Sequence, residues 1–302
     1  MSAATMIPGS PERAELMKTA AKGRSLWDDA RRRLLSNKAA VTSMIVLALL
    51  VLLAIVGPSL VPFHYDEIRK ADVWMPPLQG GHLLGTDALG RDLLARLLMG
   101  LGVSMAIGLV ATVVSLIIGV AWGAIAGYIG GRTDEVMMRI VDTLYSLPFI
   151  FFVILLMVTF GRNIFLIFVA IGAVEWLTMS RIVRGQTLSL KHKEFVEAAR
   201  AAGLGRGRII TRHIVPNLLG PVVVYVTLTI PAVIIAESFL SFLGLGVQPP
   251  MASLGTLINA GALDMELAPW LLIFPSLVMI VTLMCFNFIG DGLRDAIDPK
   301  DR

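Results

Sequence analysis

The stretch RIVRGQTLSLKHKEFVEAARAAGLGRGRIITRHIVPN, residues 181–217, decides how the rest of the chain is interpreted. It is the longest polar and basic segment in the second half of the sequence, and long apolar runs lie on both sides of it. Residues 192–202 show the spacing of an amphipathic helix. The apolar face expected for this helix consists of Phe195, Ala198, Ala199 and Ala202.

Glycine and proline predict where the elements of this stretch end. Gly203 follows the helix at a position that favours a positive φ. A second short helix is expected over residues 209–215, and Pro216 is expected to redirect the backbone. The stretch is therefore predicted to be a helix-turn-helix outside a membrane, between two membrane spans.

Composition agrees with a membrane protein. The chain has 302 residues, of which 56% are hydrophobic and 16% charged, and its mean hydropathy is +0.78. These values exclude an ordinary soluble globular protein. The net charge of +4 does not indicate nucleic-acid binding, because the basic residues cluster beside apolar runs. A single cysteine, Cys285, excludes an intrachain disulfide framework.

Hydropathy predicts an all-α polytopic membrane protein with six transmembrane helices, since a span needs about 20 apolar residues. The expected spans are 39–61, 103–129, 136–160, 164–180, 218–240 and 269–290. The chain then divides into a tail, a first span with its external segment, a five-helix core that includes the loop, and a charged C-terminus. The corresponding boundaries are 1–38, 39–102, 103–290 with 181–217, and 291–302.

Charge sets the orientation expected for these spans. With the N-terminus inside, the inner segments hold 21 of the 26 Lys and Arg residues and the outer segments hold the other five. Because basic residues concentrate on the inner side of membrane proteins, both termini and residues 181–217 are expected in the cytoplasm.

Several residues of the loop form a recognisable pattern. Glu197-Ala198-Ala199, then Gly203, then His213-Ile214-Val215-Pro216-Asn217 resemble the EAA loop of the transmembrane subunits of bacterial ABC importers. The ending at residues 213–217 resembles the peptide and nickel branch, whereas the general pattern tends to have Ile at position 213 and Leu at 215. The segments LGTDALGRD, residues 84–92, and ESFLSFLGLGVQPP, residues 237–250, also resemble that branch.

The resemblance implies a permease subunit of the bacterial inner membrane. It implies four partners: a second related permease, two ATPase subunits and an extracytoplasmic binding protein. ATP and Mg²⁺ would bind to the ATPases, so no cofactor and no enzyme activity are expected in this chain. The loop would be a coupling helix docked on an ATPase. The residues that the resemblance assigns to coupling are Glu197, Ala198, Ala199, Gly203, His213 and Pro216.

Polar residues within the spans are candidates for a translocation path. Asp142 lies near the inner end of the third span, where Arg139 is three residues away and can pair with it. Tyr225 and Thr229 share a face of the fifth span, as path lining or as ordinary interhelical hydrogen bonding. Glu237 is expected at the outer end, within reach of water. The role of Glu175 stays open.

Other features predict local structure. Thr86 or Asp87 is expected to cap a helix whose apolar face is Leu93, Leu94, Leu97 and Leu98. A GGRTDE turn at 130–135 should precede the third span, which Pro148 should bend. Glycines at intervals of four predict close packing of the second span against a neighbour; they are Gly119, Gly123 and Gly127.

Alternative functions remain at this point. The sequence has no nucleotide-binding P-loop and no zinc-protease or serine-hydrolase motif, and its four histidines are too scattered to form one metal site. Within the importer class, di- or oligopeptides compete with nickel or nickel chelates as cargo. A different class is an ion-gradient-driven carrier or channel that uses Asp142, Glu175 and Glu237. A membrane scaffold without transport is the third alternative.

Overall fold

The computed structural model describes residues 26–161 and 163–297. The predicted tail up to residue 25, Arg162 of the fourth-span turn, and residues 298–302 of the predicted C-terminus therefore lie outside the described residues. In the described part, helices dominate and the only β-structure consists of two isolated bridges. The all-α prediction is confirmed.

Five helical segments are long and apolar enough to cross a membrane. They are α3 (Lys38–Leu60), α4 (Leu93–Ile129), α7 (Ile164–Leu190), the run from α9 (Arg206–Ile209) through α10 (Val215–Phe242), and α12 (Trp270–Ile297). A sixth span is possible if the bent pair of α5 (Gly131–Tyr145) and α6 (Phe149–Phe160) counts as one. These two helices meet at 78°. Pro148 is the N-cap of α6, so the bend expected at this proline is confirmed.

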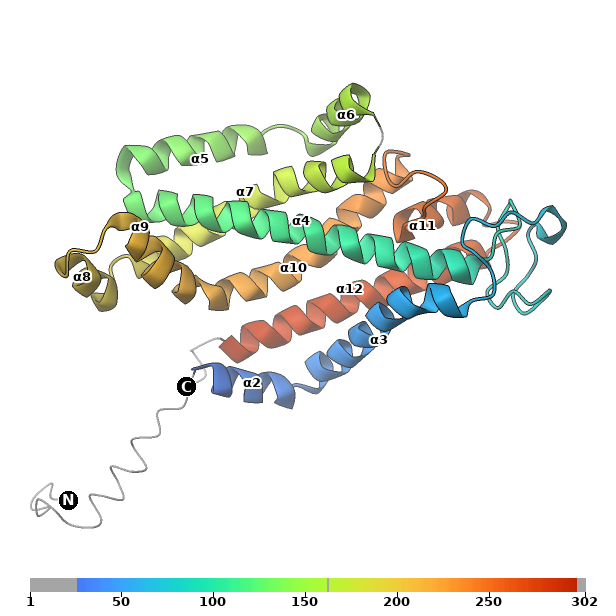
Figure 1. Ribbon diagram of the computed structural model, residues 1–302, viewed down its shortest axis with the longest axis horizontal. Coiled ribbons are helices and arrows are strands. Elements are labelled where there is room, and N and C mark those ends of the chain that lie inside the picture. Colours follow the sequence, from blue (N-terminus) through green and yellow to red (C-terminus); the bar gives the residue numbers. More distant parts are fainter. Residues whose placement is uncertain (1–25, 162, 298–302) are drawn as a thin grey trace, which may run out of the picture.

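The helices form an elongated bundle with two different ends (Figure 1). α4 runs along its length, with α5 and α6 on one side of it and α3 and α12 on the other. One end, called the α8 end, contains α8 (Glu194–Ala201), α9 and the adjoining ends of α4, α7 and α10. The opposite end, called the α11 end, contains residues 61–92, α11 (Leu254–Leu263) and the adjoining ends of α4, α10 and α12.

The glycine stripe of α4 packs directly on α7. A Cβ atom added to Gly123 would lie 2.4 Å from the carbonyl oxygen of Ser180, and one added to Gly119 would lie 2.6 Å from Met179 side-chain atoms. At Gly127 the nearest atom would be Cβ of Thr187, at 2.8 Å. The predicted packing role is therefore confirmed, and the neighbour is a span of the same chain.

Several predicted boundaries are wrong. The predicted interfacial helix and the second span are one helix of 37 residues, and its N-cap is Asp92 instead of Thr86 or Asp87. The predicted GGRTDE turn is the first turn of α5, because the chain reverses at Gly130 and Gly131, both with positive φ. α7 continues past Ser180 to Leu190, so the predicted loop begins as helix.

Part of the predicted N-terminal tail is an ordered helix. α2 (Leu26–Ser36) is followed by Asn37, whose side chain accepts a hydrogen bond from the amide of Ala40 at the start of α3. Gly292 of α12 lies against Leu34 and Ala40, where a Cβ atom would meet Cβ of Ala40 at 2.6 Å. α2 therefore packs on the bundle beside the end of α12.

Candidate coupling site and transmembrane polar groups

α8 ends in a complete glycine cap. The amide of Gly203 donates to the carbonyl of Arg200 at 3.0 Å, and the amide of Leu204 donates to the carbonyl of Ala199 at 3.2 Å. Gly203 has φ of +77°, a conformation that costs a side-chain-bearing residue energy. The positive φ predicted for Gly203 is therefore confirmed.

The apolar face predicted for α8 is wrong. Val196 and Ala199 are the buried residues of the helix, and they pack in a cluster with Ile209, Ile214 and Leu218. Phe195, Ala198 and Ala202 are exposed. The helix therefore has an inner face on the base of α10 and a second small apolar face directed outward.

Glu197 lies beside this outward face and is exposed. Among the described residues it has no ion-pair or side-chain hydrogen-bond partner. An exposed carboxylate next to apolar side chains, unpaired among the described residues, is suited to contact with another molecule.

Pro216 does not redirect the chain as predicted. Residues 210–214 form a π-helical turn, in which the amide of Val215 donates to the carbonyl of Ile210, and α10 continues from it without a break. Pro216 lies in the first turn of α10, directly after the π-helical turn. Asn217 Nδ2 donates to the carbonyl of His213 at 2.7 Å.

Asp142 pairs with a residue of another helix. Arg181 Nη2 lies 2.8 Å from Asp142 Oδ1, so the predicted pairing with Arg139 is wrong. The guanidinium of Arg181 also lies over the ring of Tyr145, 4.3 Å from its centroid. The Asp142 side chain is 59% exposed, which places it at the surface of this subunit.

A second ion pair joins the same two helices. Arg184 donates from Nε and Nη2 to the two carboxylate oxygens of Asp134, at 2.5 and 2.6 Å. Two-point pairs of this kind fix direction as well as distance. The broken α5–α6 segment is therefore attached to α7 at residues 134 and 142.

Tyr225 and Thr229 lie on one face of α10, as predicted. Thr229 Oγ1 donates to the carbonyl of Tyr225 at 2.8 Å, and Tyr225 is 37% exposed. This face continues at Ala232, which is also exposed. The stripe faces away from the core, so it is available to line a path between subunits. Glu175, in the middle of α7, has no side-chain hydrogen bond among the described residues.

The prediction that Glu237 reaches water is wrong. Its side chain is completely buried at the α11 end. Its Oε2 accepts from Ser104 Oγ at 3.2 Å and its Oε1 accepts from Ser241 Oγ at 2.6 Å. Ser104 in turn accepts from the amide of Leu254, and Ser253 caps α11. This network joins α4, α10 and α11. In the sequence, this network is indicated by Ser241, which follows Glu237 by one helical turn.

The LGTDALGRD segment folds residues 84–92 onto the start of α4. Asp87 forms an ion pair with Arg91 at 2.8 Å and lies 3.6 Å from Arg96. The buried His82 shares a hydrogen bond of 2.8 Å with Asp92, and Asp92 also caps α4 by accepting from Ala95. The local function of the segment is structural.

No candidate metal-binding site is present in the part of the chain that the structure describes. It contains no cluster of three or more His, Cys, Asp or Glu side chains able to hold a metal ion. The most notable features are instead an outward-facing helix at one end, a buried polar network at the other, and helices that span a membrane. This arrangement defines a polytopic membrane protein.

Comparison with known proteins identifies the family. Residues 119–302 match the binding-protein-dependent transport system inner membrane component, and residues 25–77 match the N-terminal transmembrane domain of oligopeptide transport permease C. The chain belongs to this inner membrane component family and, within it, to the OppC-type permeases. It is a transport subunit of a bacterial inner membrane.

Named relatives cover nearly the whole chain. It is 56% identical to the oligopeptide transport system permease protein OppC of Haemophilus influenzae, over 93% of this chain and 91% of the relative. It is 56% identical to OppC of Escherichia coli K12, over 93% of each. The dipeptide transport system permease protein DppC of Bacillus subtilis is 44% identical, over 92% of this chain and 87% of the relative.

A solved structure supports the fold. The MetNI methionine ABC transporter in an inward-facing conformation includes a chain with a TM-score of 0.55 and 18% identity, covering 67% of this chain and 96% of that one. At this identity the likeness concerns the fold alone.

Proposed function

We propose that this chain is the permease subunit of an ABC importer for di- or oligopeptides. The observation that carries the proposal is 56% identity, over 93% of the chain, to oligopeptide permeases. Relatives named for dipeptide transport extend the cargo class without changing its chemistry. The peptide alternative is preferred over the nickel alternative, because the relatives at 56% and 44% identity are named for oligopeptide and dipeptide transport.

Coupling to ATP hydrolysis takes place at the α8 end. An ATPase subunit contacts the outward face of α8, with Phe195 and Ala198 as apolar contacts and Glu197 as the charged one. Ala199 anchors the opposite face of the helix in the chain's own core. Gly203 fixes the turn after the helix. Hydrolysis occurs in the ATPases, and this chain makes and breaks no covalent bond.

Packing carries the movement of α8 into the membrane. Val196 and Ala199 share one cluster with Ile209, Ile214 and Leu218, which belong to α9, the π-helical turn and α10. His213 and Pro216 lie in this connection between α8 and the span. A displacement of α8 by an ATPase is therefore passed to α10, whose exposed face carries Tyr225 and Thr229. The bundle alternates between two packings as the ATPases close and open.

Orientation and partners follow from this arrangement. The α8 end, the end of α12 and the start of α2 lie in the cytoplasm, which agrees with the excess of Lys and Arg in the segments at this end. The α11 end faces the extracytoplasmic binding protein. A second, related permease completes the path, and Asp142 lies on the surface of this subunit that is available to it.

A detergent purification of the tagged full-length chain from its native membrane tests the proposal. We expect a P-loop ATPase and a second multi-span permease to co-purify, and the ATPase to be lost from the Glu197→Lys variant. Glu194→Lys, a charge reversal at the first residue of α8, is the matched control and should retain it. A chain that purifies alone, and that moves cargo in vesicles on an ion gradient without ATP, would overturn the proposal.

A further inference from the structure

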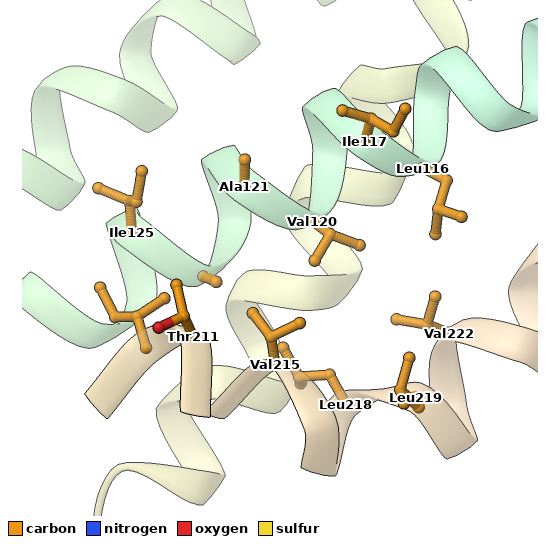
Figure 2. Close-up of a pocket in the computed structure, with 12 residues that line it drawn as sticks. Leu116, Ile117, Val120, Ala121, Ile125, Thr211, Val215, Leu218, Leu219 and Val222 are labelled. Carbon is orange, nitrogen blue, oxygen red and sulfur yellow. The ribbon is translucent and has the colours of Figure 1, made fainter. Parts of the chain in front are cut away.

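An apolar cavity lies between α4 and α10 within the membrane-spanning part of the bundle (Figure 2). Its volume is about 410 Å³. Leu116 and Val120 of α4 face it from one side, and Val215, Leu218 and Val222 of α10 face it from the other. Thr211 supplies the single hydroxyl among the lining side chains.

A second cavity of about 490 Å³ is lined on α4 by residues one helical turn beyond those of the first cavity. On α4 the lining passes from Ile125 in the first cavity to Ile129 in the second. On the facing element it passes from Ile210 to Ile209. The two cavities share no lining residue, but their walls on α4 and on the α9–α10 run adjoin in sequence.

The second cavity is lined by basic side chains, whereas the first is lined by apolar ones. Arg200 of α8 and Arg206 of α9 line it, and no acidic residue does. The guanidinium of Arg200 lies 6.0 Å from the ring centroid of Tyr128, on the α4 wall of the cavity. Within residues 26–161 and 163–297, no carboxylate forms an ion pair with either arginine. Two guanidinium groups without an anion are suited to a phosphate group.

We propose that these two cavities bind an anionic phospholipid. An acyl chain occupies the apolar cavity between α4 and α10, and the phosphate of the headgroup lies between Arg200 and Arg206. The order of the two cavities matches a lipid of one leaflet, because the apolar part lies within the spans and the basic part lies beyond them. Basic pockets between transmembrane helices are known to recognise such headgroups.

The position of the two cavities gives the lipid a role. The arginine cavity is formed by α8, α9 and the end of α4, and the acyl cavity by α4 and α10. A lipid bound in both would therefore connect the helix of the coupling site to two spans. It would stabilise the packing in which these cavities are open.

Native mass spectrometry of the full-length chain in detergent tests the site. The probes are phosphatidylglycerol, phosphatidylcholine with the same acyl chains, and inorganic phosphate. We expect at least tenfold stronger retention of phosphatidylglycerol than of phosphatidylcholine, and no displacement of the lipid by millimolar phosphate. Equal retention of the two lipids would overturn the proposal. Displacement by free phosphate would also overturn it, because the acyl cavity would then contribute nothing.

Two variants examine the two cavities separately. The double variant Arg200→Gln and Arg206→Gln should lose the preference for phosphatidylglycerol, whereas Arg208→Gln, an exposed arginine outside the cavity, should keep it. Val120→Phe should fill the acyl cavity and weaken retention of phosphatidylglycerol at least fivefold. Val113→Phe, two turns away on α4 and outside the cavity, should leave retention unchanged. Unchanged binding in both test variants, with normal size-exclusion profiles, would show that the lipid lies elsewhere.

Discussion

The two ends of the bundle treat polar groups in opposite ways. At the α11 end, His82, Asp92 and Glu237 are buried and hydrogen-bonded within the chain. At the α8 end, Glu197 and Arg200 are exposed, and Phe195 lies beside them in an outward apolar stripe. A polar group that is satisfied internally stabilises its own fold, whereas an exposed charge beside apolar surface is available to a second molecule. The buried polar groups of the α11 end are therefore used within the chain, whereas the exposed ones of the α8 end are available to a partner.

The largest effect is expected from changes at the α8 end, measured as transport. Gly203→Pro cannot adopt the φ of +77° at this position, and Glu197→Lys reverses the charge presented to the ATPase. Both variants should abolish ATP-driven peptide uptake in proteoliposomes that contain the complete importer. Membrane insertion should stay normal in both variants. Glu197→Lys should also keep the thermal stability of the parent, because Glu197 is exposed, whereas Gly203→Pro loses the cap bond to Arg200 and should be less stable. Normal uptake by both variants would remove the assignment of coupling to α8.

At the α11 end the largest expected effect is on stability. Glu237→Ala removes the acceptor for Ser104 and Ser241 and should lower the free energy of unfolding by about 2–3 kcal/mol. Glu237→Gln keeps one acceptor oxygen and the shape of the side chain, so it should cost less. Denaturation of the chain in mixed micelles measures both. An alanine variant as stable as the parent would show that the network contributes no stability.

A smaller loss is expected at the start of α4. Asp92→Ala removes the N-cap of this helix and the hydrogen-bond partner of the buried His82, at a cost of about 1–2 kcal/mol. Asp92→Asn retains a capping oxygen and is the matched control. Amide hydrogen exchange at residues 93–96 reports the loss directly. Protection that is equal in the alanine and asparagine variants would contradict the capping role.

The smallest effect is expected between the two ends, at the exposed pair of Asp142 and Arg181. Because exposed ion pairs contribute little, Asp142→Asn should change the unfolding free energy by less than about 1 kcal/mol. Asp134→Asn, which breaks the two-point pair with Arg184, should cost more in the same assay. The opposite order would mean that solvent exposure does not govern these pairs.

The sequence correctly predicted those features that depend on residues close together in the chain. The lengths of apolar runs predicted the spans, the glycine spacing predicted the contact surface of α4, and Gly203 was recognised from the turn that it forms. Each of these depends on residues within a few positions of one another. The bend at Pro148 belongs to the same group.

Interactions between distant residues were not predictable. Asp142 was matched with Arg139, three positions away, whereas its partner Arg181 is 39 positions away. Glu237 accepts from Ser104, 133 positions away, and no local pattern indicates that contact. Nearness in sequence therefore gave the wrong partner for Asp142 and left Glu237 without any partner.

The prediction of which face of α8 is buried was wrong for a different reason. A helix that packs on its own chain and on a second protein has two apolar stripes, and periodicity alone does not say which stripe is internal. Val196, the buried residue, was left out of the prediction, while Phe195 and Ala198 were included although they face outward. Of the four residues predicted to make an internal contact, Ala199 alone is buried.

The 78° break between α5 and α6 has a consequence for hydration. A break frees peptide N–H and C=O groups, and hydrocarbon offers them no hydrogen-bond partner. For α5 and α6 to cross the bilayer as one span, the peptide groups around Leu147 must therefore meet water or another protein. In that arrangement Leu147, whose exposed fraction is 53% in the isolated chain, would mark a position on this subunit where water or protein interrupts the acyl layer.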